Sequence, residues 1–243
     1  MWVGLSDHVG SEVKMAEEMT ELQLMQQEKW NTGTTWTRSD KFDEDGYLVV
    51  KDLWDPAELY HPVPEIRGQQ NFWGKRLDQF KYIPVEGQVE GSLARYWHPQ
   101  YRTIHSQIRL KLEEIIGRKL YNTYYYDRFY FPGQELSKHA DRDACEISVS
   151  VHVSTNLKGE DAKWPFWIKT PSGENRSLSL EPGDGLLYKG CERPHWRDPM
   201  PGIRKRDRIP FLKKRNPYYY HQIFFHYVLQ DGRRAHCAWD NAK

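Results

Sequence analysis

Hydrophobic and polar residues follow two different patterns along the chain, helical in its first half and extended in its second. Between residues 101 and 120 the apolar positions are spaced by three and four, which predicts an amphipathic helix. Gly117 can end this helix through a left-handed cap. Residues 11–30 alternate apolar groups with Glu and Gln and lack Gly and Pro, so a surface helix is expected there as well.

The second half consists of short runs of Tyr, Phe, Val and Ile, separated by turns rich in Gly and Pro. A turn at Asp45–Gly46 also precedes a β-branched run that ends at Val50, the pattern of a strand. Further strands are expected over residues 121–131, 146–154, 164–169, 177–180, 185–189 and 221–229. Helices followed by many short strands predict a mainly β fold, an antiparallel sandwich or barrel with helices packed outside it.

The domain organisation follows from length and from one polar segment. Residues 31–40 contain Asn, Thr, Gly, Ser and Asp, whose short side chains compete for backbone hydrogen bonds and favour turns. A chain of 243 residues is long enough for one domain with a large core. We therefore expect an N-terminal helical extension and linker over 1–40 and a single domain over 41–243.

Composition narrows the range of partners and compartments. Lys and Arg exceed Asp and Glu by 35 to 34, so bulk charge favours neither nucleic acid nor membrane, and such a partner would need a local patch. Three cysteines, Cys145, Cys191 and Cys237, lie far apart, which indicates core thiols in a reducing compartment. With no signal-peptide pattern and no membrane-spanning run, a cytoplasmic location is expected.

Three residues have the types and spacing of a metal site. In His139-Ala140-Asp141 the two ligand-bearing side chains share one face if the backbone is extended. His195 follows a Pro-Gly-Asp-Gly turn and an apolar run and supplies a third ligand. Two His and one carboxylate leave adjacent coordination positions open, as suits Fe(II) that also binds an organic cosubstrate and dioxygen. A His-X-Asp triplet by itself is more often an ordinary surface or hydrogen-bonding pair, so the prediction depends on the whole pattern.

Longer motifs around these residues resemble a known family. They are the segments 130–141, 181–188 and 194–196, and together they are similar to the metal-bearing ends of the Fe(II)/2-oxoglutarate dioxygenases. The prolyl-hydroxylase-like and phytanoyl-CoA-hydroxylase-like branches are the most similar, the second also over residues 42–50. The resemblance covers roughly residues 42–230. It implies a double-stranded β-helix, or jelly-roll, with His139, Asp141 and His195 as iron ligands and with 2-oxoglutarate and dioxygen as cosubstrates.

At the position that would bind the far carboxylate of 2-oxoglutarate, this sequence departs from the family's pattern. Most family members place an Arg or Lys about ten residues after the second His, but here the final strand begins with Gln222, and an insertion precedes it. Arg197 is the favoured replacement, because it would share a strand face with His195 and its guanidinium matches a carboxylate. Tyr130 and Gln222 are further candidate donors. The alternatives are an Arg197–Asp198 surface pair and a Tyr130 that is part of the core.

Substrate residues are predicted from position alone. Arg142 follows the metal Asp and is either a substrate anchor at the rim or the partner of Asp143 or Glu146. Trp164, Trp167 and Trp196 are candidate walls of the substrate entrance or ordinary core residues, and Trp196 adjoins His195.

A basic insertion separates the second metal His from the last strand. Residues 203–216 contain seven cations and one acid, Asp207. The cations are Arg204, Lys205, Arg206, Arg208, Lys213, Lys214 and Arg215. Such a run is usually a solvated loop; the alternative is a lid that attracts an anionic substrate, a nucleic acid or an acidic peptide.

The predicted function is an Fe(II)- and 2-oxoglutarate-dependent oxygenase that hydroxylates an unactivated C–H bond of a small molecule or a peptide. The two alternatives are a non-catalytic cupin-like module that binds a metal or a small acid, and a nucleic-acid-modifying oxygenase that uses the basic insertion. The sequence lacks a Gly-rich phosphate loop, a Cys-X-X-Cys pair and a Gly-X-Ser-X-Gly elbow, so it gives no support to nucleotide hydrolysis, structural zinc or serine hydrolysis.

Overall fold

The computed structural model describes residues 38–63, 88–202 and 218–240. From Ser39 onward they belong to one compact unit, Ser39–Lys243. The helix expected over 11–30 and the basic insertion over 203–216 lie outside the described residues. Among the helices of the described part, none is long and apolar enough to cross a bilayer.

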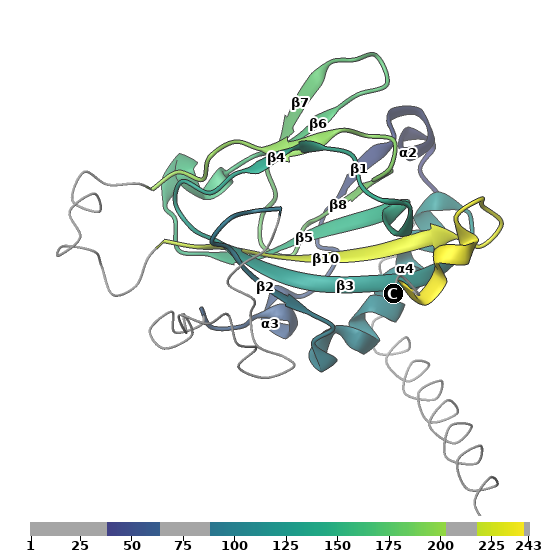
Figure 1. Ribbon diagram of the computed structural model, residues 1–243, viewed down its shortest axis with the longest axis horizontal. Coiled ribbons are helices and arrows are strands. Elements are labelled where there is room, and N and C mark those ends of the chain that lie inside the picture. The colour runs from purple at the N-terminus through teal and green to yellow at the C-terminus, as the bar shows by residue number, and fades with distance from the viewer. Residues whose placement is uncertain (1–37, 64–87, 203–217, 241–243) are drawn as a thin grey trace, which may run out of the picture. The chain divides into compact units, whose positions relative to one another are not determined.

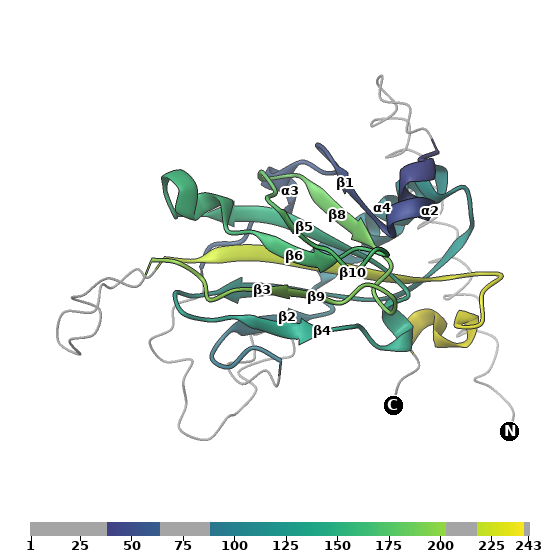
Figure 2. The same cartoon turned by 90° about the horizontal axis from the view of Figure 1, so that it is seen from above.

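Two antiparallel sheets face each other across the interior (Figures 1 and 2). The larger sheet has the order β1-β8-β5-β10-β3-β2, and the smaller has the order β4-β9-β6-β7. The strands are β1 Tyr47–Val50, β2 Leu93–Tyr96, β3 Leu120–Tyr130, β4 Leu136–His139, β5 Ile147–Thr155, β6 Phe166–Lys169, β7 Asn175–Leu178, β8 Gly185–Tyr188, β9 His195–Arg197 and β10 Tyr220–Leu229. Apart from the added strands β1 and β2, this interleaved order is that of a double-stranded β-helix, and the predicted fold class is confirmed.

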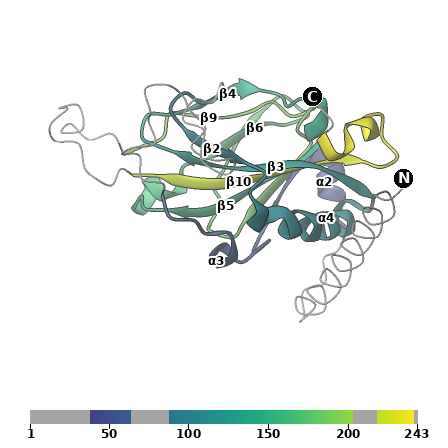
Figure 3. The ribbon, with the colours of Figure 1, turned by 60° about the horizontal axis from the view of Figure 1, so that its bottom comes forward.

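Helices cover the outer side of the larger sheet (Figure 3). They are α2 Asp40–Asp45, α3 Pro56–Leu59 and α4 Arg102–Ile116, with short 3-10 turns at Pro99–Tyr101, Asp143–Cys145, Gly159–Lys163 and Ala235–Asp240. The predicted helix is α4, and its cap Gly117 has φ 70° as expected. His105 on α4 contacts the backbone oxygen of His226 at 3.0 Å, which attaches the helix to β10.

The long strands are buried on both faces because helices cover one side and the smaller sheet covers the other. On β5, Val149 and Val151 alternate with Ser148, Ser150 and His152, and all five residues are at most 1% exposed. Strict alternation usually indicates a strand with one face in water. Here the polar face is the interior face, where Ser148 contacts Asp141 and Ser150 contacts Gln222, so the pattern does not indicate exposure to solvent.

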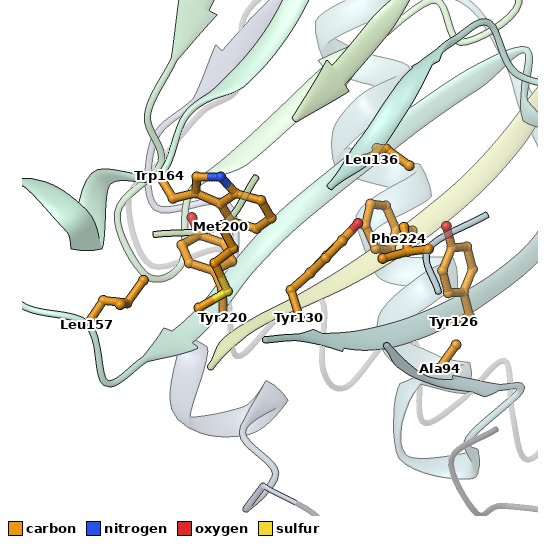
Figure 4. Packing of buried hydrophobic residues seen from close by; sticks show 10 residues of the cluster. Ala94, Tyr126, Tyr130, Leu136, Leu157, Trp164, Met200, Tyr220 and Phe224 are labelled. Carbon is orange, nitrogen blue, oxygen red and sulfur yellow. The ribbon is translucent and has the colours of Figure 1, made fainter. Parts of the chain in front are cut away.

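Aromatic side chains fill one end of the interior (Figure 4). Trp164, Met200 and Tyr220 gather on one side, Phe224 and Leu136 lie on the other, and Tyr130 extends between them.

Most predicted strands are found within two residues of their expected bounds, and β2, β4 and β9 were not predicted. These three strands have four, four and three residues, too short to show a period. The metal-bearing segments are therefore the part of the fold that local pattern described least well.

Candidate metal centre

Two short strands bring the candidate metal ligands together. His139 is the last residue of β4, His195 is the first residue of β9, and the two face each other in the antiparallel register. The sequence suggested that His139 and Asp141 share one extended strand. In the structure Asp141 lies just beyond the end of β4, so the two residues do not share it. The chain turns there, and the Asp141 N–H donates to the Gly190 oxygen at 2.9 Å.

The ligand atoms of these residues converge on one point. Nε2 of His139 and Nε2 of His195 each lie 3.5 Å from Oδ1 of Asp141. All three ligand atoms are within 4.8 Å of one another. The spacing is compatible with one ion bound at roughly 2.0–2.2 Å from each atom.

Backbone contacts fix the orientation of both imidazole rings. Nδ1 of His139 lies 2.8 Å from the Ser137 oxygen, and Nδ1 of His195 lies 2.9 Å from the Arg193 oxygen. Because a carbonyl oxygen only accepts, each Nδ1 carries a proton, and in the neutral form of each ring Nε2 keeps a lone pair directed at the shared point. This is the usual second contact of a metal-binding histidine.

The carboxylate at this point is ionised. Burial raises the pKa of Asp141, but contacts with His139 and His195 outweigh it and hold that pKa well below its ordinary value. Burial lowers the pKa of His139, and its contacts with Asp141 and the Ser137 oxygen raise it above the ordinary value. An anionic carboxylate between two imidazoles is a suitable site for a divalent cation.

A cavity of about 270 Å³ opens beside the ligands. Its walls include the aromatic side chains of Tyr124, Tyr126, Tyr188 and Phe224 beside the polar groups of the ligands. Gln88 also borders the cavity, and its amide nitrogen lies 2.7 Å from Nε2 of His139. The space is sufficient for a small organic acid next to the metal position.

A second set of possible ligands overlaps the first. Asp141, Cys145 and His226 also have ligand atoms within 4.8 Å of one another. Both Cys145 and His226 are buried and line the same cavity. The sequence reasoning missed this set, because Cys145 and His226 lie on separate elements.

Arg197 is buried deep in the barrel and is not the surface partner of Asp198. It is 1% exposed, and its Nη1 donates to the Trp164 oxygen at 2.7 Å. Its Nε and Nη2 are buried and have no hydrogen-bond partner in the described part of the chain. A guanidinium in this state needs an anion, because an unpaired buried charge is costly.

The surroundings of Arg197 are aromatic and include one more unsatisfied hydroxyl. The guanidinium lies 5.0 Å from the Tyr220 ring centre and 4.4 Å from that of Trp164. Within the described ranges the buried Tyr220 hydroxyl also has no hydrogen-bond partner. Burial raises the Tyr220 pKa to about 12, so this hydroxyl keeps its proton and can donate it. Tyr220 is the first residue of the final strand, β10, and the predictions did not include it.

The other predicted cosubstrate residues have partners of their own. Tyr130 is fully buried, and its hydroxyl accepts a bond from Nη1 of Arg128 at 2.9 Å, which leaves its own proton to donate. Gln222 donates to the Ser150 hydroxyl at 2.8 Å.

The predicted substrate residues fall in different places. Arg142 lines the cavity and lies over the Tyr124 ring at 4.5 Å, whereas Asp143 and Glu146 pair with Arg234. Trp196 has the opposite orientation to His195 on β9. It stacks on Trp167 with the ring centres 5.9 Å apart, and it does not line the cavity. Trp164 packs in the core against Tyr130 and Tyr220.

Comparisons with known proteins agree with this geometry at the level of the fold. No protein-family model matches the sequence, and no curated protein matches it. An oxidoreductase of the 2OG-Fe(II) oxygenase family from Burkholderia pseudomallei is similar in structure with a TM-score of 0.54 and 10% identity, over 84% of this chain and 92% of its own. A Trichoplax adhaerens prolyl hydroxylase in complex with a hypoxia inducible factor peptide has a TM-score of 0.51 and 10% identity, over 77% of this chain and 86% of its own. The α-ketoglutarate-dependent epimerase SnoN of nogalamycin biosynthesis has a TM-score of 0.51 and 11% identity, over 76% of this chain and 79% of its own.

These similarities establish the fold. The chain has the double-stranded β-helix of the Fe(II)/2-oxoglutarate oxygenases, with a possible two-histidine, one-carboxylate metal site in its interior.

Proposed function

We propose that the protein is an Fe(II)- and 2-oxoglutarate-dependent oxygenase whose iron ligands are His139, Asp141 and His195. The observation that carries the proposal is the convergence of two Nε2 lone pairs and one carboxylate oxygen beside a cavity. This ligand set leaves coordination positions open for a cosubstrate and dioxygen. The structural neighbours with the same fold include proteins named for iron and 2-oxoglutarate.

The interior also suits the far carboxylate of 2-oxoglutarate. Arg197 and Tyr220 offer hydrogen-bond donors that no described residue uses, and a carboxylate would satisfy both. Arg197 is two residues from His195 on the same face of β9, and the Phe166 ring contacts both side chains, with its centre 5.4 Å from each. Tyr130 can add its hydroxyl proton. By contrast, the neutral His152 donates from Nδ1 to the Leu180 oxygen, so its Nε2 offers only a lone pair and does not suit a carboxylate.

Bound Fe(II), with 2-oxoglutarate and dioxygen, supplies the oxidising chemistry that replaces an unactivated C–H bond by C–OH. The residues of this chain perform the other tasks. His139, Asp141 and His195 hold the metal on one side, and Arg197 fixes the cosubstrate at its far end. The aromatic walls of the cavity exclude water, and Arg142 at its edge is the proposed substrate anchor.

Hydroxylation of a small molecule or a peptide is the reaction we propose. The prolyl hydroxylase neighbour contains a bound peptide, which supports a substrate that enters from outside as a chain segment. The epimerase neighbour has the same fold, so the product must be identified and not assumed. Use of the basic 203–216 insertion on nucleic acid stays a secondary prediction, because that segment lies outside the described residues.

We also propose a cytoplasmic location. Cys145, Cys191 and Cys237 form no disulfide, which suits a reducing compartment.

Succinate formation is the test of the proposed function. Protein loaded anaerobically with Fe(II) and 2-oxoglutarate is exposed to dioxygen with peptidyl proline, free amino acids, lipid-like acids and nucleobases in turn. Succinate should accumulate above the slow background with one substrate class, and His139→Ala should abolish it. Binding of metal and 2-oxoglutarate without succinate from any class would favour the non-catalytic module.

A further inference from the structure

The metal carboxylate has two oxygens, and they have different surroundings. Oδ1 of Asp141 faces His139 and His195. Oδ2 faces Ser148 on β5, whose hydroxyl lies 3.1 Å away. Ser148 is fully buried, and its hydroxyl also lies 2.9 Å from Nδ1 of His226 and 3.1 Å from the Cys145 oxygen.

The proton arrangement in this group follows from counting donors. A hydroxyl has one hydrogen, whereas a carboxylate and a carbonyl oxygen only accept. If Ser148 donated to His226, it would present only lone pairs to Asp141, which is unfavourable. Nδ1 of His226 therefore carries a proton and donates to Ser148, and the Ser148 hydroxyl is left to donate to Oδ2 and the nearby carbonyl.

A glycine closes the other side of the same oxygen. A Cβ at Gly190 would collide with Oδ2 of Asp141, with the Cys145 oxygen and with the Ser148 hydroxyl. Backbone thus packs directly against the carboxylate, and the Gly190 oxygen accepts the Asp141 N–H. The carboxylate is confined in one orientation.

We infer that Ser148 and His226 are positioning residues that hold Asp141 as a one-oxygen ligand of the metal. The inference rests on the proposed metal site of the oxygenase. Hydrogen bonds to a ligating carboxylate orient it and tune the metal. With Oδ2 occupied by Ser148, the carboxylate binds through Oδ1 only and does not take a second coordination position, so the remaining positions stay open for cosubstrate and dioxygen.

The experiment compares two serines on the same strand. Ser148 and Ser150 are both fully buried and face the interior, but Ser150 accepts from Gln222 and does not contact Asp141. Metal dissociation constants are measured with Co(II) for the full-length parent, Ser148→Ala, Ser148→Thr and Ser150→Ala. Ser148→Ala should weaken Co(II) binding by about 10- to 100-fold, Ser148→Thr should restore most of it, and Ser150→Ala should bind Co(II) within about twofold of the parent.

His226 is tested in the same titration. His226→Asn keeps a donor near the position of Nδ1 and should bind Co(II) more tightly than His226→Leu. The visible spectrum of the Co(II) protein, which depends on coordination number and geometry, should change in Ser148→Ala and not in Ser150→Ala. If Ser148→Ala only lowers the melting temperature, with the Co(II) constant and spectrum unchanged, the residue is structural and the inference is wrong.

Two further outcomes separate this inference from the proposed function. If His139→Ala binds Co(II) as well as the parent, the metal site itself is wrong, whatever Ser148 does. If the first equivalent of Co(II) gives a thiolate charge-transfer band that Cys145→Ser removes, the ion occupies the Asp141, Cys145 and His226 set. That result overturns the positioning role, because His226 would then be a ligand.

Discussion

Two clusters in this protein are each built around one aspartate, and they differ in whether their contacts are complete. In the first, Asp127 lies on the outer face of β3 with Arg95 and His221. Both Asp127 oxygens accept bonds of 3.0 Å from Arg95, and His221 contacts one of them at 2.9 Å. In the second, the nearest approach of His139 and His195 to Asp141 is 3.5 Å.

The difference shows how a structural cluster can be told from a candidate metal site. In the Asp127 cluster each ring or guanidinium donates to the acid, and the charges balance inside the group. In the Asp141 cluster the lone pairs of both neutral histidines and one carboxylate oxygen face the same point, so a divalent cation can bind all three. His139 and Asp141 are also more exposed than the members of the Asp127 cluster, and the direction of the protons further separates the two roles.

The largest expected effect comes from replacing the aspartate of each cluster, Asp127 or Asp141, by asparagine, which has nearly the same shape and no charge. Asp127→Asn should lower the free energy of unfolding of the metal-free protein by about 3–5 kcal/mol, because Arg95 stays buried without its partner. Asp141→Asn should lower that free energy by less, because Asp141 lies 3.5 Å from both histidines, while it abolishes metal binding and succinate formation. Urea denaturation and metal titration of both variants measure the contrast. Equal loss of stability in both variants would make Asp141 a structural residue and remove the distinction.

The next effect concerns the arginines, since Arg95 is paired with an acid and Arg197 is not. Arg197→Ala should raise the dissociation constant for 2-oxoglutarate by roughly 30-fold or more, the result of losing about 2–5 kcal/mol from a buried charged contact. Arg197→Gln should recover part of the affinity, because it keeps hydrogen bonds but not the charge. Calorimetry of the Ni(II)-loaded protein measures both variants, and metal affinity should change little.

Arg95→Ala is the matched control for Arg197. It should destabilise the fold and leave 2-oxoglutarate binding near that of the parent wherever the variant is folded. If both Arg197 variants bind 2-oxoglutarate like the parent, the partner of the carboxylate is to be sought at Arg128 or among the cations of residues 203–216.

A further expected effect is a pH dependence of stability. Burial lowers the pKa of His105 to about 3 and that of His152 to about 4. The unfolded chain therefore binds more protons than the folded chain between about pH 6.5 and 4, so stability is lost as pH falls through this window. Each of these two histidines contributes up to about 1.4 kcal/mol per pH unit there. The pKa of His139 is raised, so its contribution is complete below about pH 6.5 and is lost only as pH rises above that value.

The histidine effect can be separated from that of the acids. Asp127 has a lowered pKa, so its stabilisation is lost only below the ordinary carboxyl pKa of about 3.8. Urea denaturation of the metal-free protein at pH 7, 6, 5 and 4 should show a decline that is already present at pH 5. His105→Phe, which keeps a ring against Phe225, should have a shallower decline, and an identical slope would show that His105 is not buried in the neutral form.

The sequence by itself predicted the main helix and most of the strands, and it proposed the metal ligands. Spacings of three and four gave α4, turn residues separated most of the strands, and the His139, Asp141 and His195 pattern identified the candidate site. These features are carried by local spacing and by short motifs. Local pattern could not show which way β5 faces, because its Ser and His positions would suit a solvent-facing strand and in fact face the interior.

Only the tertiary structure decided which polar residues surround the metal position and what each contacts. Register between β4 and β9 set His139 opposite His195, and the packing of β5 and β10 placed Ser148 and His226 behind Asp141. Tyr220 came to lie beside Arg197 because β9 and β10 belong to opposite sheets that close over one interior. The physical reason is that hydrogen-bond satisfaction and burial are properties of neighbours in space, and strands far apart in the sequence supply those neighbours.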